Sequence, residues 1–239
     1  MSETTAPAPR KTKVPRVNVR RRTTQWLLAP LVIITIGLGW KYPLVGLIVP
    51  TVMLIGIIGG IIRGRYVCGN LCPRGSFLDR MIAPISLKRP IPEFLRKPAF
   101  RWIVLAAMMG FMVFRISQNP SDIMHWGRVF WVMCLATTAI GVVLGVLVHP
   151  RAWCSFCPMG TMQSKLGGHK HTLQIDGAAC KSCGLCAKAC PFGLSPMDHK
   201  DAGILEERDC LKCAECTAAC PIGALTFPSK GDQAREKAA

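Results

Sequence analysis

Two copies of one cysteine pattern near the C-terminal end strictly limit how that part of the chain can fold. The first copy is Cys180-x-x-Cys183-x-x-Cys186-x-x-x-Cys190-Pro191. The second copy is Cys210-x-x-Cys213-x-x-Cys216-x-x-x-Cys220-Pro221. Three cysteines spaced three residues apart wrap one iron–sulfur cube in a tight loop, and each cube needs a fourth thiolate. This is the spacing of ferredoxins that hold two [4Fe–4S] clusters.

The fourth cysteine of each run is predicted to ligate the cluster of the other run, because crossing the runs supplies each cube with its fourth thiolate. A zinc or disulfide interpretation would leave the cysteine before each proline without a role. The pattern therefore predicts a protein that moves electrons. One predicted ligand set is Cys180, Cys183, Cys186 and Cys220, and the other is Cys190, Cys210, Cys213 and Cys216.

The apolar residues lie in long uncharged runs, and half of the 239 residues are hydrophobic. A helix needs about 20 apolar residues to cross a bilayer. The runs at 44–62 and 129–148 reach that length, whereas those at 26–40 and 102–114 depend on flanking residues. Buried or re-entrant helices are the alternative for the two shorter runs. We expect four membrane crossings.

The basic residues are unevenly distributed between the predicted spans. Residues 1–22 hold seven Lys and Arg and residues 63–101 hold nine, whereas the turns at 41–43 and 115–128 hold one and two. This is the positive-inside pattern, so both termini and the cysteine-rich C-terminal part are predicted to lie in the cytoplasm. The pattern also accounts for most of the formal net charge of +17. We expect a lipid bilayer, and no nucleic acid, as the partner of these charges.

Four further cysteines lie in two related loops. The first cysteine loop, residues 65–75, reads Arg65-Tyr-Val-Cys68-Gly-Asn-Leu-Cys72-Pro-Arg-Gly75. The second, residues 151–160, reads Arg151-Ala-Trp-Cys154-Ser-Phe-Cys157-Pro-Met-Gly160.

Each loop follows an even-numbered span, which predicts a tandem repeat of helix, helix and cysteine loop. Both loops are then expected at the same membrane face. Cys68, Cys72, Cys154 and Cys157 are candidates for an additional metal centre or for redox-active dithiols. Turns fixed by Pro and Gly alone are the structural alternative.

With these loops, the chain resembles the membrane-bound quinol-dehydrogenase ferredoxins. That group includes the H subunit of periplasmic nitrate-reductase systems and a similar protein of methylamine-utilisation clusters. The resemblance covers about residues 20–227 and implies quinol as electron donor, the bacterial cytoplasmic (inner) membrane as location, and a redox protein or reductase subunit as partner. The second loop departs from the family pattern, because two residues rather than three separate Cys154 from Cys157.

The predicted fold class is a membrane α-helical domain of four transmembrane helices in a tandem helix-pair repeat, joined to a small α+β two-cluster ferredoxin domain. We expect a disordered basic tail at 1–19, the membrane domain at 20–160, a linker at 161–171, the ferredoxin domain at 172–228 and a disordered tail at 229–239. The acidic insert between the cysteine runs, residues 191–209, is expected to be a solvated loop, with docking of a basic partner as the alternative.

Two functions are open at this point. The first is an electron-transfer subunit that oxidises quinol and feeds a reductase. The second is an assembly or maturation factor that reduces a metal or a thiol for another redox enzyme. No catalytic residue is predicted, because the chain has no nicotinamide or flavin fingerprint.

Overall fold

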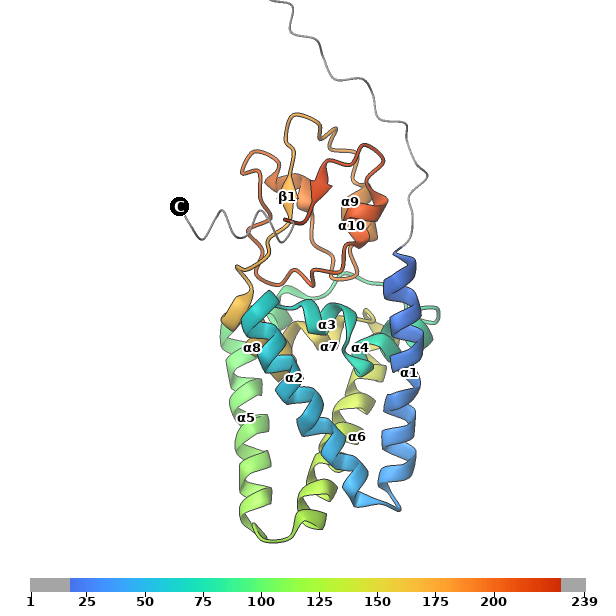
Figure 1. The fold of residues 1–239 in the computed structure, drawn as a ribbon, viewed down its shortest axis with the longest axis vertical. Coiled ribbons are helices and arrows are strands. Elements are labelled where there is room, and N and C mark those ends of the chain that lie inside the picture. The colour runs from blue at the N-terminus through green and yellow to red at the C-terminus, as the bar shows by residue number, and fades with distance from the viewer. Residues whose placement is uncertain (1–17, 229–239) are drawn as a thin grey trace, which may run out of the picture.

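A computed structural model describes residues 18–228, and the expected tails lie outside this range apart from residues 18 and 19 of the N-terminal one. Long helices run side by side, and a smaller unit built from the C-terminal residues sits at one end of them (Figure 1). The four long helices are α1 (Val19–Gly39), α2 (Ile48–Arg63), α5 (Pro98–Ser117) and α6 (Ile123–Leu147).

Within residues 18–228, three helical segments are long and apolar enough to cross a membrane. They are Pro43–Arg63, which joins a 3₁₀ turn at Pro43–Leu47 to α2, then α5, then α6. Only 6% of the apolar stretch of α5 is buried inside the protein, so most of its apolar surface is free to contact lipid. These helices indicate a membrane protein. The remaining predicted crossing, at residues 26–40, lies in helix α1. This helix is not one of the three candidate spans, and its first turn carries Arg20, Arg21 and Arg22.

Each cysteine loop folds as two short helices. The first forms α3 (Tyr66–Asn70) and α4 (Pro73–Phe77), and the second forms α7 (Ala152–Phe156) and α8 (Pro158–Gly167). In both loops a cysteine occupies the N-cap position of the second helix and proline takes its first position, although only the Cys72 thiol accepts a capping hydrogen bond, from Gly75 N. Proline suits that position because its missing N–H would have no partner there in any case.

The stretch between the predicted domains is largely helical. Helix α8 continues to Gly167, into the range 161–171 that we expected as a linker, and it packs on α2 and α5. Shorter turns follow the first loop, with a π-helical turn at Leu78–Ile82 and a 3₁₀ turn at Glu93–Arg96.

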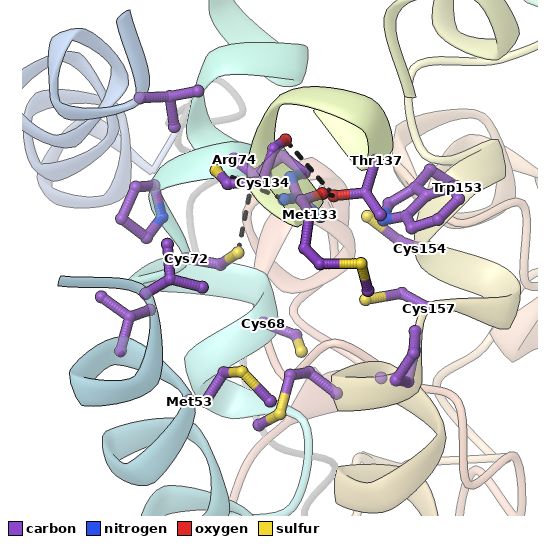
Figure 2. A pocket seen from close by; sticks show the side chains of 18 of the residues that line it. Met53, Cys68, Cys72, Arg74, Met133, Cys134, Thr137, Trp153, Cys154 and Cys157 are labelled. Carbon is purple, nitrogen blue, oxygen red and sulfur yellow. Dashed lines mark hydrogen bonds between the residues drawn. The ribbon is translucent and has the colours of Figure 1, made fainter. Parts of the chain in front are cut away.

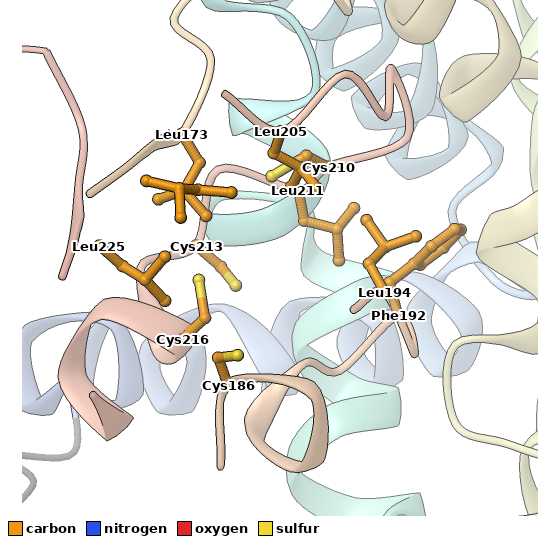
Figure 3. Packing of buried hydrophobic residues seen from close by; sticks show 11 residues of the cluster. Leu173, Cys186, Phe192, Leu194, Leu205, Cys210, Leu211, Cys213, Cys216 and Leu225 are labelled. Atoms are coloured by element: carbon orange, nitrogen blue, oxygen red, sulfur yellow. The ribbon is translucent and has the colours of Figure 1, made fainter. Parts of the chain in front are cut away.

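The C-terminal unit combines short helices with a small sheet. Strands β1 (Gln174–Ile175) and β2 (Leu225–Thr226) pair antiparallel, with Ile175 opposite Leu225. Helices α9 (Leu185–Ala189) and α10 (Glu215–Ala219) lie next to each other, and a 3₁₀ turn covers Pro196–His199. Leucines and cysteines share one buried core (Figure 3).

This unit is docked tightly on the cysteine loops. A Cβ built on Gly69 would collide with the backbone oxygen of Leu211, so the two segments touch through their backbones. The Asn70 Nδ2 donates a hydrogen bond to the Lys212 oxygen at 3.4 Å. Cys68 and Cys154 pack against the core of the C-terminal unit. The second cysteine run therefore lies directly on the two cysteine loops.

We predict that Gly69→Val loosens this docking, because the new side chain would overlap the Leu211 carbonyl. Overpacking of this kind typically costs about 1–3 kcal/mol. Hydrogen–deuterium exchange of the detergent-solubilised protein should become faster in the segment around Leu211. Gly110→Val is the matched control, since a Cβ there would meet no atom within 4 Å. Equal exchange in both variants would contradict the close backbone contact.

Candidate functional site

The two cysteine runs share an unusual backbone conformation at matching positions. Ser182 and Lys212 each precede the second cysteine of a run and have φ of 50° and 51°. Gly184 and Ala214 each follow that cysteine, with φ of 76° and 58°. Left-handed conformations are uncommon for residues with a Cβ and cluster at functional sites. Both runs are therefore bent in the same way around their cysteines.

Two small cavities are each lined by four cysteines of the C-terminal unit. Thiolates are the usual protein ligands of [4Fe–4S] clusters, so both cavities have a donor set that fits such a cluster. In each cavity, three of the cysteines come from one run and the fourth comes from the other run. The sets are Cys180, Cys183, Cys186 and Cys220 in one cavity, and Cys190, Cys210, Cys213 and Cys216 in the other.

The two cavities differ in their distance from solvent. Cys210, Cys213 and Cys216 are buried, and their part of the core is visible in Figure 3. Cys183 of the other cavity is exposed. The first cavity therefore has an outward side, whereas the second faces the cysteine loops.

The four cysteines of the loops meet at a third place. Cys68, Cys72, Cys154 and Cys157 all line one cavity of about 170 Å³ between the long helices (Figure 2). Across residues 18–228, no three His, Cys, Asp or Glu side chains are arranged to hold a single metal ion. The cysteines of the two C-terminal cavities are likewise too far apart to bind one metal ion together. Such spacing is expected for a [4Fe–4S] cubane, whose four ligands bind four different iron atoms.

Each loop sends its first arginine across to the other loop. Arg65 of the first loop donates from Nη2 to the backbone oxygen of Cys154 at 2.7 Å. Arg151 of the second loop donates from Nη1 to the backbone oxygen of Cys68 at 3.1 Å. Arg65 and Arg151 are 0% and 1% exposed, so both guanidinium groups are fully enclosed beside the cysteines. The two loops thereby form one interlocked site.

The glycine at the end of each loop leaves room for this exchange. A Cβ on Gly160 would lie 2.6 Å from Arg65 Nη2, and a Cβ on Gly75 would lie 2.7 Å from Arg151 Nη1. Any larger residue would displace the guanidinium. The arginine of the Arg-x-x-Cys motif in one loop therefore packs against the glycine of the Cys-Pro-x-Gly motif in the other loop.

Asp79 pairs with the second loop's arginine. Its carboxylate accepts hydrogen bonds from Arg151 at 2.8 and 2.6 Å and from Arg21 at 2.8 Å. Arg21 also pairs with Glu215 of the C-terminal unit at 2.7 Å. Burial alone would raise the pKa of Asp79, but the charge of Arg151, followed by that of Arg21, holds this pKa below its ordinary value.

Asp209 pairs with the first loop's arginine. Its carboxylate lies 2.8 Å from Arg65 and 2.8 Å from Arg101 of α5. Burial would raise the pKa of Asp209, and the charges of Arg65 and Arg101 outweigh burial and lower it. Asp209 ends the insert that we expected to be solvated. The residue instead docks a basic surface of the same chain, directly before Cys210.

The loop thiols lie in an environment that opposes their ionisation. Burial raises the pKa of both Cys68 and Cys154, and the neighbouring cysteines raise it further. The charge of Arg65 on Cys68 and of Arg151 on Cys154 acts in the opposite direction. Metal ligation requires the thiolate. A bound cationic centre together with these arginines would supply the positive charge that four thiolates need.

Sequence reasoning named twelve cysteines in three sets of four, and each set lines one cavity, but it missed the residues that position them. The arginines were visible only as the first letter of a repeated motif, and Asp79 carried no signal of its own. The repetition of Arg before the first cysteine and of Gly after the second was the available clue.

The chain matches two kinds of known protein domain. Residues 179–225 match a 4Fe-4S dicluster domain, and residues 45–92 and 129–174 match a 4Fe-4S binding domain. The second match contains both cysteine loops. These matches define an iron–sulfur electron-transfer protein of the ferredoxin type.

Two curated proteins are distantly similar to the chain. The methylamine utilization ferredoxin-type protein MauN of Methylorubrum extorquens is 27% identical over 150 residues, which is 57% of this chain and 51% of that protein. An uncharacterized protein of Methanocaldococcus jannaschii is 24% identical over 154 residues, which is 62% of this chain and 60% of that protein. The chain thus spans between half and three-fifths of these relatives. No solved structure matches the chain.

We predict that Asp209→Asn destabilises the protein, because Arg65 and Arg101 lose their shared counter-charge while they stay buried. Breaking a buried pair typically costs about 3–5 kcal/mol. At about 2–4 °C per kcal/mol for a chain of this size, the thermal midpoint should fall by at least about 6 °C. Asp198→Asn, at an exposed site in the same insert, is the control and should leave the midpoint unchanged.

The pH dependence should separate the same two variants. Because folding lowers the pKa of Asp209, its stabilising contribution is present above the ordinary carboxyl pKa of about 3.9 and is lost as the pH falls through the lower folded-state pKa. The difference in thermal midpoint between wild type and Asp209→Asn should therefore shrink in acid. A constant difference down to low pH would contradict this pairing.

Proposed function

We propose that this chain is a membrane-anchored electron carrier that oxidises a quinol in the bilayer and passes the electrons to a partner redox protein or reductase subunit. The observation that carries the proposal is the position of the four loop cysteines. They line a cavity between apolar helices on one side, and on the other side Cys68 and Cys154 pack against the cysteine-rich core. A bilayer-soluble donor and a ferredoxin-type acceptor would meet at this place.

In the C-terminal unit, the proposed ligand sets are the two groups of four cysteines that line its cavities. Each set takes three cysteines from one run and one from the other, as the spacing predicts. When bound, a [4Fe–4S] cluster accepts and releases one electron, which suits stepwise transfer from a two-electron donor. The chain's own residues hold the two sites in a fixed relation through the shared core.

We propose that Cys68, Cys72, Cys154 and Cys157 form a single third redox centre and not two separate dithiol pairs. The exchange of Arg65 and Arg151 supports this, because each loop completes the surroundings of the other loop's first cysteine. Two enclosed guanidinium groups also offset the negative charge that four thiolates would bring.

We place the protein in the bacterial inner membrane, with the cysteine loops and the C-terminal unit at the cytoplasmic face. The first residues of α1, both loops and the C-terminal unit lie at one end of the long helices (Figure 1). The excess of Lys and Arg in residues 1–22 and 63–101 supports a cytoplasmic position for that end.

Cys190→Ser should damage the cluster bound mainly by the second run, because Cys190 lines the cavity of Cys210, Cys213 and Cys216. We expect a loss of up to about four irons per chain and a change in one of two cluster signals in electron paramagnetic resonance. Cys134→Ser, at the one cysteine outside the three groups, is the control. Damage to the signal of the first run's cluster would refute the exchange of ligands.

Changing any one of the four loop cysteines to serine should stop quinol from reducing the ferredoxin-type clusters. Dithionite reaches the C-terminal unit directly, so reduction by dithionite should survive in the same variants. Visible absorbance after addition of each reductant measures both reactions. If all four variants accept electrons from quinol at the wild-type rate, the loop cysteines are structural and electrons enter elsewhere.

A further inference from the structure

Arg74 stands apart from the other arginines near the cysteine loops. It lines the 170 Å³ cavity, and within residues 18–228 it makes no ion pair. Its Nε donates to Thr138 Oγ1 at 3.2 Å, its Nη2 lies 3.7 Å from Cys134 Sγ, and its guanidinium lies 5.9 Å from the ring centre of Trp153. The arginines that do pair with Asp79, Asp209 or Glu215 are Arg21, Arg65, Arg101 and Arg151.

Two hydrogen-bond donors of residues at this cavity have no acceptor within the described part of the chain. Trp153 Nε1 and Arg65 Nε are both buried without a partner, and both residues line the cavity. No Asp or Glu among the described residues lines it. A buried N–H without an acceptor costs about 1–3 kcal/mol, so such groups are usually satisfied by something bound. The cavity therefore offers several donors to a ligand that carries acceptor oxygens.

Arg74 and Trp153 also lie at positions where the two loops carry different residues. When the loops are aligned on their cysteines, Arg74 corresponds to Met159, and Trp153 corresponds to Val67. Arg65, Arg151 and the terminal glycines already account for how the loops hold each other. Arg74 and Trp153 take no part in the exchange of arginine hydrogen bonds between the loops, and they place polar groups on a largely apolar wall.

The rest of the wall suits a flat apolar ring. Thioether side chains are adaptable and pack well against aromatic groups. An ionisable group without a counter-charge among membrane-type helices usually marks a binding site. Arginine remains protonated in proteins, so Arg74 acts as a donor and not as a proton acceptor. The methionines that line the cavity are Met53, Met108, Met109, Met112, Met133 and Met159. Figure 2 labels Met53 and Met133.

We propose that this cavity binds the headgroup of the quinol, with an oxygen of the ring accepting hydrogen bonds from Arg74 and from the Trp153 indole. This inference rests on the proposed function and names the binding site for its electron donor. The ring would then lie against Met133 and beside the four loop cysteines, which line the same cavity. A guanidinium at the oxygen favours binding because its charge-assisted hydrogen bonds are stronger than neutral ones.

The test uses the full-length protein in detergent and decylubiquinol as the probe. Arg74→Met gives the first loop the residue of the second, and Trp153→Phe keeps an aromatic ring, although a smaller one, and removes the N–H. Arg115→Gln, at an exposed arginine of α5, is the matched control. We expect the apparent KM for decylubiquinol to rise about tenfold or more in Arg74→Met and about threefold in Trp153→Phe. Dithionite reduction, iron content and the control variant should match the wild type.

Binding of decylubiquinone by calorimetry separates this inference from the proposed function. If wild type binds it, and Arg74→Met binds it about tenfold more weakly, the site stands whether or not quinol reduces the clusters. Equal binding and equal KM in wild type and Arg74→Met would overturn the site while leaving the proposed function intact. If wild type binds no quinone but co-purifies with an anionic phospholipid that Arg74→Met loses, Arg74 holds a lipid headgroup and the inference is wrong.

Discussion

Two largely buried carboxylates, each shared by two arginines, connect the cysteine loops to the rest of the described structure. Asp79 links the second loop to α1, and Asp209 links the first loop and α5 to the C-terminal unit. A buried charge is costly unless it is paired and hydrogen-bonded. Separating either carboxylate from its arginines would therefore leave an uncompensated charge inside the protein. The relative positions of the loops and the second cysteine run follow from this pairing.

Much of the architecture could be predicted from local sequence. The cysteine runs indicated two four-cysteine sets because ligand spacing in a tight loop is a local property, and each set lines one cavity. The apolar runs predicted helices close to those found, since a run of that length has few other stable forms in a bilayer. Helix α1 was expected as a crossing, yet mostly polar residues occupy its first two turns. Among residues 18–228, three segments have the length and hydropathy of a span, and α1 is not one of them.

The residues that hold the site together could not be predicted, because their contacts join distant parts of the chain. Arg65 and Asp209 are 144 residues apart, and Arg151 and Asp79 are 72 apart. Composition gave a reason to expect a solvated acidic insert, and nothing local distinguished Asp209 from its acidic neighbours. Arg74 likewise looked like one more basic loop residue, and only the cavity beside it shows that it has no counter-charge.

The close backbone contact between Gly69 and Leu211 has a consequence for how the protein meets other molecules. A ferredoxin unit on a slack tether could swing between a donor and an acceptor. Here the unit rests on the loops through backbone contact, buried charge pairs and a shared core, so it has no room to travel. Under the proposed function, an acceptor would have to come to this unit, at the outer side where Cys183 is exposed. Diffusion of the acceptor, and not a domain swing, would then limit how often the two proteins meet.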